Sequence, residues 1–171
     1  MNKLIGQTVV CGFAAIWAWY GVSPFSAAGW LIPVVIAPSL VIPLLAWLRP
    51  RAEDAEAAAG SGQSFFIVVA LEGAATFLAV NLAANLGHPQ LEMPAVALVV
   101  GLHFLPLARI FRRPAYVATG LALCGLAAAS AFIDGPERVA LLGLGAAATL
   151  WLTLLFSIFG RSPAHGPLQQ A

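Results

Sequence analysis

Two ionisable side chains stand inside long apolar stretches of this sequence, where they could take part in proton chemistry. Glu72 lies in VVALEGAATF (68–77), and His103 lies in VVGLHFLPLARIFRRP (99–114). A carboxyl group and an imidazole that lie close together can hold one proton between them. Because a charge in an apolar surrounding is costly, each group needs either a partner or a functional reason to be there.

The surrounding composition indicates that these groups sit in a membrane. Hydrophobic residues make up 61% of the 171 residues, and charged residues only 9%, whereas soluble domains carry about 25% charged residues. A bilayer core about 30 Å thick is crossed by roughly 20 apolar residues in a helix. We therefore expect an all-α transmembrane bundle of six spans: 4–22, 28–48, 64–86, 94–111, 115–133 and 139–159.

The basic residues predict how the bundle is oriented. With the N-terminus in the cytoplasm, only Arg138 lies outside, and seven basic residues lie inside: Lys3, Arg49, Arg51, Arg109, Arg112, Arg113 and Arg161. Cytoplasmic loops carry an excess of Lys and Arg, so both termini are predicted to be cytoplasmic. Residues 1–160 then form one transmembrane domain with a cytoplasmic linker at 49–63, and 161–171 form a disordered cytoplasmic tail.

The first span is expected to be retained rather than cleaved, because its apolar region is long and closes with Trp17, Trp19 and Tyr20. Aromatic rings of this kind favour the headgroup level. The strong preference for Arg over Lys, with abundant Ala and Gly, suggests a bacterial gene. We therefore expect a multi-pass protein of the bacterial inner membrane.

Depth in the membrane brings the two ionisable groups to one level. Glu72 and His103 each lie about 12 Å from the cytoplasmic end of their spans, at 1.5 Å per residue. The two spans are joined by a short connection, so they are expected to pack as antiparallel neighbours. We predict a contact between the two groups. It either serves transport or only holds the helices together.

Pro106 adds an irregularity beside His103. Proline has no N–H, so the Leu102 carbonyl loses its helical partner. The candidate coupling or binding site therefore comprises Glu72, His103, Pro106 and Leu102. Asn81 and Asn85 are secondary polar residues of the third span, about half a turn around the helix from Glu72.

Prolines and small residues shape the other spans. The second span contains Pro33, Pro38 and Pro43, and it is either a curved wall helix, which we favour, or a broken helix that coordinates a ligand. Spacings typical of close helix contacts occur at Gly120/Cys124, Gly125/Ala129 and Gly143/Ala147. These pairs predict tight contacts within the bundle or in a homo-oligomer.

Several classes of function are disfavoured. The sequence contains no HExxH, GxSxG, P-loop or dinucleotide-binding motif, so an enzyme is the least favoured class and no cofactor is expected. The three histidines, His88, His103 and His165, fall in different regions, which argues against a metal site. A net charge of +1 provides no field to attract nucleic acid. The lipid bilayer is the expected partner.

One segment resembles a known group of proteins. The pattern G-x-H-F-x-P, followed by Phe111, Tyr116 and Gly120, reads here as Gly101, His103, Phe104 and Pro106 with those three residues. It resembles an uncharacterised bacterial family of small multi-spanning membrane proteins, a domain of unknown function, and covers about twenty residues. The resemblance implies no established activity, and Glu72 lies outside it.

Two functions from different classes remain. The first is a small-solute or proton-linked transporter with Glu72 and His103 as its coupling site. The second is a non-transporting assembly or accessory protein in which these two residues are structural. The transporter hypothesis requires the pair to border a polar cavity that opens to one side of the membrane.

Overall fold

The computed structural model describes residues 3–25, 29–48 and 62–159. Two short 3-10 turns, η1 (Ser23–Phe25) and η3 (Pro89–Leu91), accompany six helices, namely α1 (Lys3–Val22), α2 (Leu31–Leu48), α4 (Gly62–Asn85), α5 (Glu92–Ile110), α6 (Pro114–Ser130) and α7 (Pro136–Phe159). The predicted linker at 49–63 lies outside the described residues, except that residues 62 and 63 belong to α4. The predicted tail at 161–171 also lies outside them.

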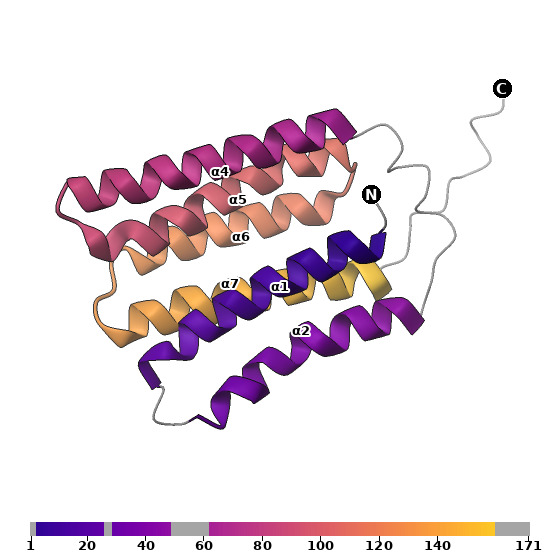
Figure 1. Ribbon diagram of the computed structural model, residues 1–171, viewed down its shortest axis with the longest axis horizontal. Coiled ribbons are helices and arrows are strands. Elements are labelled where there is room, and N and C mark those ends of the chain that lie inside the picture. Colours follow the sequence, from indigo (N-terminus) through magenta and orange to yellow (C-terminus); the bar gives the residue numbers. More distant parts are fainter. Residues whose placement is uncertain (1–2, 26–28, 49–61, 160–171) are drawn as a thin grey trace.

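The helices form an all-α bundle, as predicted. Neighbouring helices run in opposite directions, and their order across the bundle is α4, α5, α6, α7, α1, α2 (Figure 1). The first and last helices of the chain are therefore packed together in the middle. The beginning of α1 and the end of α7 lie at the same end of the bundle (Figure 1), as an even number of crossings requires.

Five of the described helices are long and apolar enough to cross a membrane. The exception, α6, has 17 residues and a length of about 25 Å, at the lower limit for a span. Large apolar side chains face outward along the helices, such as Leu40, Phe66 and Phe77, which are 72%, 71% and 67% exposed. Water would oppose such a surface, so the chain is a multi-pass membrane protein.

The helices begin and end within a few residues of the predicted spans, and the fourth and fifth illustrate the differences. The fourth, predicted as 94–111, begins earlier because η3 continues into α5, and together they give an apolar segment of 22 residues, Pro89–Ile110. The fifth, predicted as 115–133, ends at Ser130. It stops there because Arg138 binds carbonyls of the following turn, and because Gly135 adopts a φ of +73° that turns the chain back.

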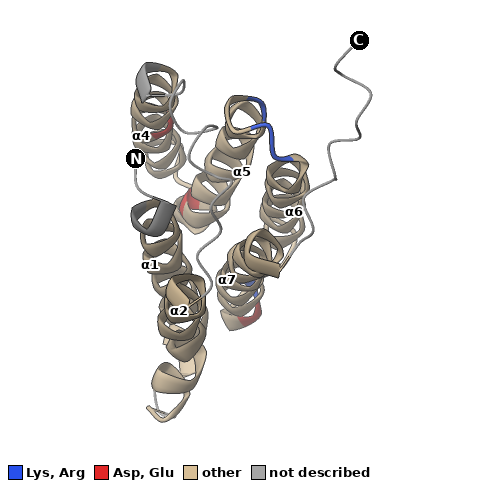
Figure 2. Ribbon diagram, turned by 90° about the vertical axis from the view of Figure 1, so that its right-hand side faces the viewer, with Lys and Arg blue, Asp and Glu red and all other residues tan. Residues whose placement is uncertain are grey.

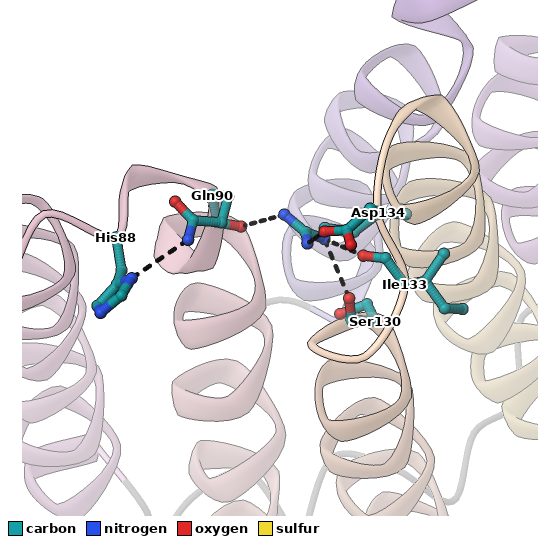
Figure 3. A network of polar contacts seen from close by, with 6 residues as sticks. His88, Gln90, Ser130, Ile133 and Asp134 are labelled. Atoms are coloured by element: carbon teal, nitrogen blue, oxygen red, sulfur yellow. Dashed lines mark hydrogen bonds and ion pairs between the residues drawn. The ribbon is translucent and has the colours of Figure 1, made fainter.

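Arg138 organises the end of the bundle at which α7 begins (Figure 3). It is buried, and its Nε donates hydrogen bonds to the carbonyls of Ser130 and Ile133. Its Nη1 donates to the Gln90 carbonyl at 3.2 Å, and its Nη2 pairs with Asp134 Oδ1 at 2.6 Å. One guanidinium group thus joins the connection between α4 and α5 to the one between α6 and α7.

The arginines of the opposite end are separate from Arg138. Arg109, Arg112 and Arg113 lie where α5 turns into α6, which is blue in Figure 2, whereas Arg138 lies in the first turn of α7. This distribution agrees with the charge separation on which the orientation was based. The side chains of Lys3, Arg49, Arg51 and Arg161 lie outside the described residues.

Glycines allow the closest helix contacts of the bundle. A Cβ atom on Gly143 would lie 2.4 Å from the Gly21 Cα atom, and one on Gly21 would lie 2.6 Å from the Leu144 backbone nitrogen. The α1–α7 contact is therefore possible only with glycine at both positions. The buried core around it includes Ala14, Ala18, Leu142, Ala146 and Ala147.

The proline-rich helix α2 forms the wall of the bundle. It remains helical through Pro38 and Pro43, which fits the favoured wall helix and not a broken one. Ser39, which is buried, accepts a hydrogen bond from Trp151 Nε1 at 2.9 Å. Because an unsatisfied polar group in lipid is costly, this bond helps hold α2 on α7.

Candidate functional site

The helix that carries Glu72 is attached to the bundle along one stripe. No residue of Ser64–Asn85 in α4 is buried. The half-buried residues Phe65, Val68, Glu72 and Thr76 follow at spacings of three and four, which places them on one face of the helix. The principal neighbour of α4 is α5, so Glu72 faces the helix that carries His103.

Glu72 and His103 meet across this seam. Glu72 Oε2 lies 3.4 Å from His103 Nδ1, and the side chains are 24% and 9% exposed, respectively. His103 Nδ1 is buried and has no hydrogen-bond partner among the described residues. The ring also interacts with the backbone of Val68, one turn before Glu72. The two ionisable groups are thus in contact without a completed hydrogen bond.

Aromatic rings connect the histidine to the arginine-bearing end of α5. His103 packs edge-on against Phe104, and Tyr116 contacts both Phe104 and Phe111, with ring centroids 5.7 and 6.1 Å away. Phe111 also contacts Phe65 of α4 at 6.0 Å. Edge-to-face pairs of this kind stabilise packing beyond the area that they bury. The cluster fixes α4, α5 and α6 relative to one another on this side of the pair.

A second close helix contact positions α5 against α6. A Cβ atom on Gly101 would lie 2.8 Å from the Gly120 carbonyl oxygen and 2.7 Å from Cys124 Sγ. A Cβ atom on Gly120 would lie 2.6 Å from the Gly101 carbonyl oxygen. The G-x-H-F-x-P segment and the residues after it therefore form one packing unit, a helical hairpin that presents His103 to α4.

The other predicted site residues do not join the pair. The Leu102 side chain is 51% exposed, and Pro106 lines a separate pocket at the end of α5. Asn81 donates its amide to the Phe77 carbonyl of its own helix at 2.7 Å, and Asn85 is exposed at the end of α4. The contact that the structure provides is thus between Glu72 and His103.

That separate pocket lies between the end of α5 and the beginning of α6 and has a volume of about 570 Å³. Arg109, Arg112 and Arg113 line it. Glu72 and His103 are not among its lining residues, so it does not lead to the pair. Among the described residues no group of three or more His, Cys, Asp or Glu side chains is arranged to hold a metal ion.

Sequence reasoning missed two polar contacts within the bundle. The hydroxyl groups of Thr119 and Thr153 are hydrogen-bonded between α6 and α7 at 2.5 Å, and both residues are buried. The other contact is the bond from Trp151 to Ser39. Thr and Ser occur in many helices without such a role, so only their burial in the folded bundle distinguishes these residues.

Comparison of the chain with protein-family models, with curated proteins and with solved structures gave no match.

Proposed function

We propose that the protein is a proton-linked transport or permeation unit of a bacterial inner membrane, in which Glu72 and His103 take up and release the proton. The observation that carries the proposal is the 3.4 Å approach of Glu72 Oε2 to His103 Nδ1 between α4 and α5. Ionisable side chains within membrane spans characteristically mark ion pathways and proton relays. At this separation the proton belongs to the pair rather than to either residue.

The unpartnered nitrogen of His103 supports this function over a purely structural one. A polar group that only holds two helices together is expected to complete its hydrogen bond, because an unsatisfied group in lipid is costly. His103 Nδ1 is buried without a partner, and a movement of a few tenths of an ångström would bring Glu72 into normal hydrogen-bond range of about 2.7–3.2 Å. A small movement of either side chain would therefore complete this hydrogen bond.

The low burial of α4 would allow this helix to move when the protonation of Glu72 and His103 changes. None of the residues in Ser64–Asn85 is buried, whereas α5 packs against both α4 and α6. Elements that move during function belong to the parts of a protein with few buried contacts. Protonation of the pair would change how strongly α4 is held to α5 and so couple a proton to a helix movement.

A second candidate function is that of a non-transporting assembly or accessory protein. The observation that favours it is that the arginine-lined pocket does not reach Glu72 or His103, whereas transport requires a polar cavity that borders the pair. The outer face of α4 is also apolar and is not covered by the described residues, with Phe66, Phe77 and Leu78 exposed by 71%, 67% and 65%. Under this alternative the pair only attaches α4 to α5.

Proton uptake into proteoliposomes separates the two functions. The full chain is reconstituted into liposomes that enclose a pH-sensitive dye. An inside-negative potassium diffusion potential then drives protons into the liposomes. We expect uptake above that of empty liposomes, abolished by Glu72→Gln and strongly reduced by His103→Gln. Glu92→Gln, which removes a carboxylate from the first turn of α5, should leave uptake unchanged.

Wild-type uptake equal to that of empty liposomes, or uptake unaffected by Glu72→Gln, would refute the transport function. If Glu72→Gln instead lowered only the thermal stability of the purified protein, the assembly function would be supported.

A further inference from the structure

The pocket between the end of α5 and the beginning of α6 has three arginines and five apolar residues in its lining, and it has no role in the function proposed above. Its lining includes Arg109, Arg112 and Arg113, together with Leu105, Pro106 and Val117, and no acidic residue. Neither Arg109 nor Arg112 is paired with an acid among the described residues. Guanidinium groups form charge-assisted, often bidentate hydrogen bonds with phosphate. A pocket with this lining therefore has the chemistry to bind a phosphate group.

An exposed apolar strip leads from the pocket toward the middle of the bundle. On α5 it consists of Leu102 and Leu98, which are 51% and 43% exposed. On the adjacent helix α6 it consists of Val117 and Leu121, which are 41% and 61% exposed. Within each pair the residues are four apart, so they lie on one face of their helix. A ligand with a phosphate in the pocket and a hydrocarbon chain on this strip would satisfy both surfaces.

The backbone conformation of Arg112 supports a binding role for its side chain. Arg112 has a φ of +50°, in the left-handed region that favours glycine. The Arg113 N–H donates to the Ala108 carbonyl at 3.0 Å, which is the hydrogen bond of a helix end that normally has glycine at this position. An arginine here costs stability, and such local strain is characteristic of binding sites.

We propose that this pocket binds the phosphate headgroup of an anionic phospholipid from the cytoplasmic leaflet, with the acyl chains along the strip formed by Leu98, Leu102, Val117 and Leu121. The pocket lies at the end that the distribution of basic residues assigns to the cytoplasm. That leaflet is rich in anionic lipid, and basic pockets between transmembrane helices on this side bind such headgroups.

Native mass spectrometry of the full chain in detergent tests the proposal. The protein is mixed with phosphatidylglycerol or phosphatidylcholine of the same acyl chains, and bound lipid is counted. We expect phosphatidylglycerol to bind preferentially and the affinity to fall about 5-fold for each arginine lost in Arg109→Gln and Arg112→Gln. Arg109→Lys, which keeps the charge, should lose less.

Equal binding of the two lipids, or binding unaffected by the Arg109→Gln/Arg112→Gln double variant, would overturn the proposal. Inorganic phosphate provides the third arm. If phosphate at the concentration of the lipid displaced phosphatidylglycerol, the pocket would be a soluble-anion site, and the lipid proposal would be wrong.

The Arg112→Gly variant distinguishes a binding defect from a folding defect. Glycine adopts the left-handed conformation freely, so this variant should unfold at a temperature equal to or a few degrees above that of the wild type. It should nevertheless bind about 5-fold less phosphatidylglycerol. Unchanged lipid binding by this more stable variant would show that the Arg112 side chain has no part in the site.

Discussion

Two seams of this bundle are built in opposite ways. Between α1 and α7, Gly21 and Gly143 allow the backbones to touch, and the surrounding residues are buried alanines and leucines. Between α4 and α5 a single stripe of half-buried side chains makes the contact, and its centre is the pair of Glu72 and His103. The first seam has the close packing that stabilises helices in lipid, where no hydrophobic effect drives them together. The second depends on a polar contact whose strength changes with protonation.

This difference assigns stability mainly to the α1–α7 seam and function to the α4–α5 seam. A seam made of glycine contacts has one arrangement, because any displacement loses packing on both sides. A seam made by one stripe and two ionisable groups can exist in more than one arrangement at little cost. We therefore expect substitutions in the α1–α7 seam to affect folding, and those in the α4–α5 seam to affect proton binding.

The largest change in the free energy of unfolding is expected for Gly143→Ala. The added Cβ atom would lie 2.4 Å from the Gly21 backbone, so the two helices must separate, at a cost of about 1–3 kcal/mol. The measurement is the free energy of unfolding in detergent micelles. Gly12→Ala is the matched control, because a Cβ atom on Gly12 of the same helix pair meets nothing within 4 Å. Equal losses in the two variants would contradict the close contact.

The next largest loss of stability is expected for Arg138→Gln. Arg138 joins the α4–α5 connection to the α6–α7 connection at one end of the bundle. Arg138→Gln leaves the carbonyls of Ser130, Ile133 and Gln90 without their donor, which is expected to destabilise the fold by about 2 kcal/mol. Arg109→Gln at the other end should change stability little, because Arg109 is exposed. Denaturant unfolding of both variants checks the comparison, and equal stabilities would show that the network is not structural.

Double-mutant cycles compare the polar contacts of two seams directly. The buried hydrogen bond between Thr119 and Thr153 should give a coupling energy near the average of about 0.6 kcal/mol for interhelical bonds. Glu72 and His103, which lack a completed hydrogen bond, should give less at neutral pH. The cycles use Thr→Val, Glu72→Gln and His103→Gln. A coupling above about 1.5 kcal/mol for Glu72 and His103 would favour the structural function of the pair.

The smallest changes in stability are expected for substitutions on the outer faces of α4 and α6. A Cβ atom on Gly73 of α4 or on Gly125 of α6 meets nothing within 4 Å. Alanine at either position should raise helix stability by roughly 0.5–1 kcal/mol, because it has less backbone freedom to lose. Thermal unfolding of Gly73→Ala and Gly125→Ala checks this. A loss of stability at Gly125 would instead reveal that a second copy of the chain packs on this face, through the predicted Gly125/Ala129 pair.

Much of the arrangement around Glu72 and His103 could be predicted from the sequence. Their equal depth and the short connection between α4 and α5 placed them face to face, because sequential helices with short loops pack as neighbours. The apolar stretches also predicted each helix to within a few residues. The end of α6 could not be predicted in this way, because it depends on Arg138 binding carbonyls of the turn before it.

Contacts between distant helices were beyond the reach of sequence reasoning. Gly143 was recognised as a residue for close packing, but its partner Gly21 lies at the other end of the chain. Nothing in the periodicity of α1 and α7 selects them as neighbours. The same holds for the arginine pocket, since Arg109, Arg112 and Arg113 supplied the topology prediction, and only the fold places them beside the apolar strip.

The most direct test of the central claim is infrared difference spectroscopy of the reconstituted protein between acidic and neutral pH. If Glu72 and His103 share a proton, the carbonyl band of a protonated carboxyl group disappears on raising the pH. That band is then absent in Glu72→Gln, shifted in His103→Gln and unchanged in Glu92→Gln. A spectrum of wild type identical to that of Glu72→Gln at every pH would contradict proton binding at this pair.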